Sequence, residues 1–133
     1  MSQEPSAPDK AALDAVRRAL DEAEQRDSVG ALPYLREAAD RLTELIDESM
    51  AAAVLSGQAS LRSAAQSAGM TENAVPPRLA RTRTLGAYAD ERGRVTASGV
   101  ERARYDLEKG VPAPASAAAP PPPMRFKPRR PSR

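Results

Sequence analysis

The chain contains no cysteine and no histidine among its 133 residues. Without cysteine nothing points to a disulfide or a thiolate metal site, and without histidine the commonest general base and metal ligand of proteins is missing. Most hydrolytic mechanisms lose their usual participants, so we expect a protein that is not an enzyme and uses no cofactor. A run of carboxylates is then interpreted as the solvated side of an amphipathic helix: Glu37, Asp40, Glu44, Asp47 and Glu48.

Long apolar runs are also missing. The longest one, residues 50–55, is far too short to cross a bilayer, and the first ten residues have neither the basic start nor the apolar segment of a signal peptide. We therefore expect a soluble, cytoplasmic protein without a membrane partner. Because the proline-rich ends cannot join a core, about 100 residues remain to form one small domain.

The net charge of +2 conceals an uneven distribution. Residues 1–56 carry 6 basic and 12 acidic side chains, whereas residues 57–105 carry 8 basic and 4 acidic ones. Residues 112–133 add 5 basic side chains and no acidic one. An acidic half followed by a basic half is typical of a protein with a polyanionic partner, which would meet the second half.

A first amphipathic helix is predicted over residues 8–27, after a disordered segment at residues 1–7. Leu13, Val16 and Leu20 recur at spacings of three and four, and together with Ala23 they give a narrow apolar stripe. A stripe of this width is buried either against another element of the chain or against a second copy. Residues 8–27 are therefore a candidate homodimer contact.

A second, longer helix is predicted to begin at Pro33 and to stop at Gly57, a residue suited to a left-handed helix end. Residues 27–32 contain Ser28 and Gly30 and are interpreted as the connection that precedes it. Its wide apolar face makes this helix the expected backbone of the core. That face comprises Leu35, Ala38, Ala39, Leu42, Leu45, Ile46, Met50, Ala53 and Val54.

Residues 60–85 have the spacing of two short helices that cross closely. Ser60 is a suitable N-cap for a helix over residues 61–68, and the small Ala65 permits a close crossing. Gly69 supplies the positive φ of a sharp turn. The residues expected to fill the angle between the two helices are Met70, Val75 and Leu79.

The start of the second of these helices has two interpretations. Either Thr71 caps it, or the two prolines delay its start to Pro76, from which it runs to Arg83. In the second case Asn73 belongs to a longer turn. Arg78 and the arginines that follow it are on the helix in both cases.

A small β-hairpin is predicted over residues 85–97, because Tyr88 and Val95 favour strands on either side of the turn from Asp90 to Gly93. A capping box from Ser98 to Glu101 then predicts a last helix that stops at Gly110. Residues 111–133 are predicted to be a disordered, proline-rich basic tail.

This order of elements over residues 33–110 resembles the winged helix-turn-helix domains of bacterial transcription regulators, in which the hairpin is the wing. The resemblance rests on Ala65, Gly69, Met70, Thr71, Val75 and Leu79 for the crossed helices, and on Gly93 to Thr96 with Gly99 for the wing. It implies a mainly α fold: a small winged helix-turn-helix domain with one short hairpin, preceded by an amphipathic helix and flanked by disordered termini.

The resemblance also implies DNA as the partner. In such domains the second helix of the pair places its first residues at base edges in the major groove, while the flanks and the wing contact phosphates. Asn73 offers the geometry that reads adenine, and Arg78 or Arg81 the geometry that reads guanine. The candidate DNA-binding residues are Arg62, Thr71, Asn73, Arg78, Arg81, Arg83, Arg92 and Arg94.

The tail has two candidate uses. Arg125, Lys127, Arg129 and Arg130 are suited to phosphate contacts. Alternatively, the four consecutive prolines before them form a stiff ligand for the aromatic groove of a protein partner. The sequence thus favours a small DNA-binding regulator located at the nucleoid, and the alternative is a protein-interaction module that does not bind nucleic acid.

Overall fold

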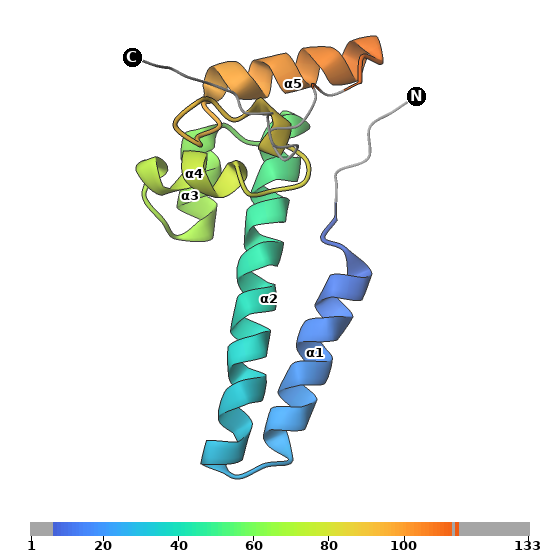
Figure 1. Ribbon diagram of the computed structural model, residues 1–133, viewed down its shortest axis with the longest axis vertical. Helices are drawn as coiled ribbons and strands as arrows, with labels where there is room; N and C mark the ends of the chain where they lie inside the picture. The colour runs from blue at the N-terminus through green and yellow to red at the C-terminus, as the bar shows by residue number, and fades with distance from the viewer. Residues whose placement is uncertain (1–6, 113, 115–133) are drawn as a thin grey trace, which may run out of the picture.

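The computed structural model describes residues 7–112 and 114, and it is mainly α-helical. Figure 1 shows a long helical hairpin of α1 and α2 that projects from a compact group formed by α3, α4 and α5. We call residues 10–46 the stalk and residues 47–110 the head. The elements are α1 (Lys10–Glu24), α2 (Ser28–Leu55), α3 (Leu61–Ala68), the 3-10 turn η1 (Glu72–Ala74), α4 (Val75–Leu79), the 3-10 turn η2 (Gly86–Tyr88) and α5 (Ala97–Lys109).

Helix α2 begins at Ser28, so the predicted connection over residues 27–32 and the predicted start at Pro33 are wrong. The cause is Asp27, whose carboxylate accepts a hydrogen bond of 2.7 Å from the Gly30 amide and so caps the helix. Pro33 lies in the second turn, where it removes one backbone donor without ending the helix. Only residues 25–27 therefore separate α1 from α2, and the two helices lie antiparallel.

The stalk is held together mainly by small side chains. Its buried apolar residues are Val16, Ala19, Ala23, Ala31, Ala38 and Leu45. Alanine lets two helices approach closely, but it buries little apolar area. Of the stripe predicted for α1, Val16 and Ala23 pack within the chain, whereas Leu20 remains 46% exposed.

The head has a denser core. Met50, Ala51 and Val54 of α2 enter it from one side. Four large side chains are fully buried there: Val75, Leu79, Leu85 and Val95. Each contributes about 1.5–3 kcal/mol through burial, so the head gains more hydrophobic stabilisation than the stalk. Because α2 contributes to both cores, it is the element that joins them.

The described residues contain no β-strand, so the hairpin predicted over residues 85–97 is wrong. Its two ends are used for packing, because Leu85 and Val95 are each 0% exposed. Between them only a tight turn forms, in which the Asp90 amide donates to the Arg94 carbonyl at 2.8 Å. β propensity at a few positions is overridden here by the burial that each side chain obtains separately.

Helix α5 begins at Ala97 after an N-cap at Thr96, and the capping box predicted from Ser98 to Glu101 is not formed. Gly99 has a different role in its first turn. A Cβ atom at this position would lie 2.8 Å from the Tyr88 carbonyl oxygen, so only glycine lets α5 approach η2 this closely. The contact is completed by the Tyr88 hydroxyl, which donates to Asp106 Oδ2 at 2.8 Å.

Candidate nucleic-acid interface

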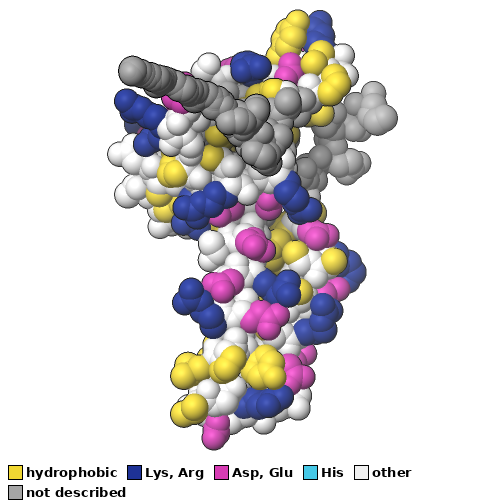
Figure 2. Space-filling view, viewed as in Figure 1, with side chains coloured by type: hydrophobic (Ala, Val, Ile, Leu, Met, Phe, Trp, Pro, Cys, Tyr) yellow, Lys and Arg dark blue, Asp and Glu magenta, His cyan; other side chains and the backbone are white. Residues whose placement is uncertain are grey.

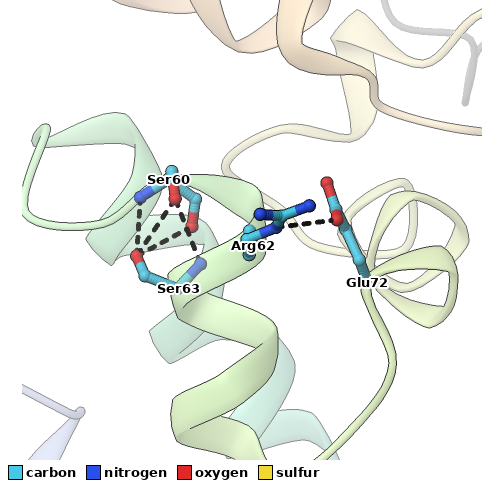
Figure 3. A network of polar contacts seen from close by, with 4 residues as sticks. All are labelled: Ser60, Arg62, Ser63 and Glu72. Atoms are coloured by element: carbon cyan, nitrogen blue, oxygen red, sulfur yellow. Dashed lines mark hydrogen bonds and ion pairs between the residues drawn. The ribbon is translucent and has the colours of Figure 1, made fainter.

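Helix α3 has well-defined ends, as the sequence predicted. The Ser60 hydroxyl accepts from the Ser63 amide at 3.0 Å, and the Ser63 hydroxyl accepts from the Ser60 amide at 2.9 Å (Figure 3). At the other end Gly69 adopts a φ of 75°, and the Met70 amide donates to the Ala65 carbonyl at 3.0 Å. Reciprocal caps and a left-handed stop fix where the chain leaves α3 and thus where the next element begins.

The second helix of the pair is short, and it matches neither predicted version. Thr71 makes no side-chain cap, and the chain enters α4 at Val75 through the 3-10 turn η1, which contains Asn73. Pro76 lies in the first turn of α4, where helical amides have no intrahelical partner, so it is tolerated. The helix ends at Leu79. Contrary to the prediction, the arginines at 81 and 83 lie beyond its end.

In the segment formed by η1 and α4, the exposed residues lie at the beginning. Val75, Pro76 and Leu79 are buried, whereas Thr71, Glu72 and Asn73 are exposed. The first residues of the pair's second element are therefore open to a partner, and its later residues are committed to the core.

Arg62 of α3 reaches across to this exposed edge. Its Nε lies 3.4 Å from Glu72 Oε1, as Figure 3 shows, and the two side chains are 75% and 52% exposed. An ion pair this open contributes little to stability, and water or another anion competes for it. Arg62 thus remains accessible to an anion, at the place where Thr71 and Asn73 flank Glu72 in the chain.

Arg78 is held differently. Its Nε lies 2.7 Å from Asp47 Oδ1, and the side chains are only 28% and 9% exposed. This pair connects α4 to α2 across 31 positions of the sequence. A buried carboxylate at this distance is a stronger partner than a solvated one. Arg78 therefore anchors α4, whereas the sequence predicted a base contact for it.

Arg83 is only loosely held. The backbone amide of Arg83 donates a hydrogen bond of 2.9 Å to Glu48 Oε2. The Nε of Arg83 is 3.9 Å from the same oxygen, and the Arg83 side chain is 87% exposed. Arg81 is exposed as well. Both arginines line a shallow depression at the junction with the stalk that is also lined by Glu44 and Glu48, so their positive field is partly offset.

Asp47 and Glu48, which the sequence led us to interpret as solvated charges, thus make tertiary contacts to Arg78 and to the Arg83 amide. A signal for Asp47 exists in the sequence: it precedes Met50, Ala51 and Val54 by three, four and seven residues, which places it on the core-facing side of α2. A carboxylate on that side requires a partner. The partner's identity, by contrast, depends on tertiary packing.

The turn at residues 90–94 replaces the predicted wing. Asp90 Oδ1 accepts from the amides of Arg92 at 2.9 Å and Arg94 at 3.1 Å. The Val95 amide then donates to the Pro76 carbonyl at 2.9 Å, which ties the end of the turn to α4. Arg92 is exposed and Arg94 is partly so. The turn therefore holds two arginines near α4 without a β-ladder.

Figure 2 shows how the basic side chains are distributed on one side of the head. On the side of the head that Figure 2 shows, Lys and Arg side chains lie in separate groups, and Asp and Glu side chains accompany them at the junction with the stalk. The predicted tail contacts Arg125, Lys127, Arg129 and Arg130 lie outside the described residues, as does the segment before residue 7.

Other kinds of site find little support. Within the described part of the chain no three Asp, Glu, His or Cys side chains are grouped in a way that suits a metal ion. None of the described helices combines the length and the apolar character that crossing a membrane requires. No protein-family model, curated protein or solved structure matches this chain. The function is therefore inferred from the geometry of α3, α4 and the turn at residues 90–94.

Proposed function

We propose that the protein is a small DNA-binding protein, a transcription regulator, whose head contacts DNA through a helix-turn-helix formed by α3 and α4. The observation that carries the proposal is the exposed edge from Thr71 to Asn73 at the beginning of the second element, next to Arg62, while the turn that carries Arg92 and Arg94 is tied to α4. Residues 57–105 also carry 8 basic against 4 acidic side chains. Both features suit a groove lined by phosphates.

The proposal divides the candidate residues by role. Thr71 and Asn73 face base edges in the groove, where an amide side chain reads adenine. Arg62, Arg92 and Arg94 contact phosphates on either side, and Arg81 and Arg83 supply further phosphate contacts at the end of α4. Arg78 sets the position of α4 through Asp47 and contributes to binding only indirectly.

The test is a salt titration of binding to genomic DNA fragments by the full chain. Replacing Arg62, Arg92 and Arg94 with glutamine is expected to reduce the slope of log affinity against log salt by about 0.9 for each phosphate that the variant no longer neutralises. The matched control replaces Arg17, Arg18 and Arg36 of the stalk with glutamine and leaves the slope unchanged. Absence of binding at low salt overturns the proposal.

Sequence preference is tested separately with Asn73→Ala. We expect this variant to retain its salt dependence but to lose discrimination at one base position, by a factor corresponding to about 1–3 kcal/mol. If wild-type binding has no sequence preference to lose, an architectural role replaces that of a regulator.

The alternative is a protein-interaction module that does not bind nucleic acid. One observation favours it: the carboxylates of Asp47 and Glu48 already occupy Arg78 and the backbone of Arg83. Charge reversal at Arg81 separates the two functions. Loss of DNA retention with an intact fold supports the DNA-binding protein, and an unchanged cellular phenotype supports the interaction module, for which the proline-rich tail is a second candidate contact.

A further inference from the structure

Helix α2 carries a row of aliphatic side chains that neither core uses. Leu32 is 60% exposed, Leu35 and Leu42 are each 44% exposed, and Ile46 is 37% exposed. Ala39, between them, is exposed as well. These five positions are separated by three, four, three and four residues, which is the spacing by which one helix packs along another in bundles and coiled coils. The row extends over roughly 20 Å of the helix.

Helix α1 widens this row. On α2 the row lies about a quarter turn from Ala38 and Leu45, which are buried against α1. On α1, Leu13 and Leu20 lie about a quarter turn from Ala19, which is buried against α2. Because the two helices are antiparallel, both displacements point to the same side of the hairpin. Counting back from the turn places Leu20 level with Leu32.

The opposite side of the stalk is charged. Glu37, Arg41 and Glu44 lie nearly half a turn away from the row on α2. Figure 2 shows a side of the stalk on which acidic and basic side chains alternate along the helices. Helix α2 therefore has one side suited to water and one side that remains apolar, while on α1 the exposed Arg17 and Glu24 lie beside Leu20.

The stalk also lacks a second layer of its own. Four of its six buried apolar residues are alanine, so the contact between α1 and α2 buries less apolar surface than two leucine-lined helices would. Stable helical domains place such a pair against further helices. The head does not supply them, since its core begins at Met50 of α2.

The exposed area matches what a dimer requires. The row and Leu20 leave on the order of 400–500 Å² of apolar surface in one strip, which is the size of the largest patch on a typical monomer, often a functional one. A homodimer of ordinary size buries about 800 Å² on each partner, and roughly 65% of this, about 500 Å², is apolar. No charged residue occupies a position within the row. A second copy can therefore cover the row on α2 without burying a charge from the row itself, and Arg17 and Glu24 of α1 lie at the edge of the contact.

We propose that a second copy of this chain covers the row, so that two stalks form a four-helix bundle and the assembly carries two heads. The contact is centred on α2, whereas the sequence pointed to residues 8–27. The dimer itself follows from the stalk alone; its consequence, two heads that engage neighbouring segments of one DNA duplex, rests on the proposed function.

The first experiment measures the mass of the full chain by light scattering over a range of concentrations. We expect twice the chain mass of 14.2 kDa for the wild type. The double variant Leu35→Glu, Leu42→Glu should have the mass of one chain with its helical circular dichroism retained. The control Glu37→Gln, Glu44→Gln, on the charged side, should remain dimeric. A wild type with the mass of one chain throughout, or a dimer that survives the leucine replacements, overturns the proposal.

A second experiment does not depend on the folding of that variant. Because the chain has no cysteine, Ala39→Cys introduces a single thiol into the row. A short bis-maleimide is expected to link two such chains efficiently and to link the control Glu44→Cys poorly. Equal linkage of the two variants places the contact elsewhere and overturns the proposal.

The dimer and the DNA contact fail independently. If the leucine variant is monomeric and keeps salt-dependent DNA retention that is weaker by about tenfold or more, both stand, because linked sites gain from effective concentration. A dimeric wild type that does not retain DNA at low salt refutes the proposed function and leaves the dimer intact. A monomeric wild type that retains DNA refutes the dimer and leaves the proposed function intact.

Discussion

The stalk and the head share helix α2 but are stabilised in different ways. The head surrounds α2 with four fully buried large side chains, while the stalk packs it against α1 mainly through alanine. Their ion pairs also differ in what they connect. Those of the stalk, such as Arg36 with Asp40, join neighbouring turns of one helix, whereas Arg62 with Glu72 and Arg78 with Asp47 join separate elements of the head, and only the last pair is largely buried. The head is therefore held by its own core, whereas the stalk leaves large aliphatic side chains of α2 exposed.

The head and the stalk should differ most in the stability lost when a buried leucine is truncated, and the largest loss is expected from Leu79→Ala in the head. Leu79 is 0% exposed, so its truncation should lower the free energy of unfolding by about 3–4 kcal/mol, through reduced burial and a residual cavity. Leu45→Ala in the stalk should cost about 2 kcal/mol, because small neighbours leave its site open to water. Denaturant unfolding followed by circular dichroism measures both. Equal losses would show that the two regions are packed to the same density.

An intermediate effect is expected from Asp47→Asn at the junction of the two regions. The change leaves Arg78 without its carboxylate, and we expect a loss of about 1–2 kcal/mol, less than for a fully buried pair because Arg78 is 28% exposed. Asp40→Asn in the stalk is the control, and its effect should stay within a few tenths of a kcal/mol. If the two variants lose equal stability, the Arg78 pair does not anchor α4.

The smallest effect, about 1 kcal/mol, is expected from Tyr88→Phe, which removes the hydrogen bond to Asp106. The change also has a signature in pH. Burial raises the pKa of the Tyr88 phenol above its usual value, and the hydrogen bond to Asp106 raises this pKa further. The folded state thus favours the neutral phenol. Its contribution is complete below about pH 10 and is lost as the pH rises through the folded pKa.

Wild type and Tyr88→Phe should therefore differ at neutral pH and converge in strong alkali, as measured by denaturant unfolding over this range. Tyr105→Phe is the control, since Tyr105 is 58% exposed and should show no such convergence. Curves that remain parallel above about pH 10 would mean that the Tyr88 phenol does not contribute in the way that its burial indicates.

Features that depend on neighbouring residues could be predicted from the sequence. The Ser60 cap and the left-handed stops at Gly57, Gly69 and Gly110 are confirmed. They are fixed by interactions within a few positions of the chain, and the residue types that make them are few. The mainly α character of the fold follows from the same local rules.

Features that depend on competing local signals or on partners far away in the sequence could not be predicted from the sequence. At the start of α2, the cap from Asp27 outweighs the breaking tendency of Gly30 and Pro33, and the strength of one local signal against another is not visible in their order. The predicted hairpin is wrong for a second reason: Val95 is fully buried in the head core, and this burial depends on tertiary packing that β propensity does not report. Arg78 found its carboxylate 31 residues away, beyond the reach of any periodic pattern.

Most of helix α2 lacks the residues at which helices usually kink. From Tyr34 to Leu55 the helix contains neither glycine nor proline, and the same rod lies in both cores. Sharp kinks in helices usually occur at such residues, so this part of α2 lacks the usual site for one. Leu35, in the exposed row, and Asp47, which holds the arginine that positions α4, therefore lie roughly 18 Å apart on one uninterrupted helix.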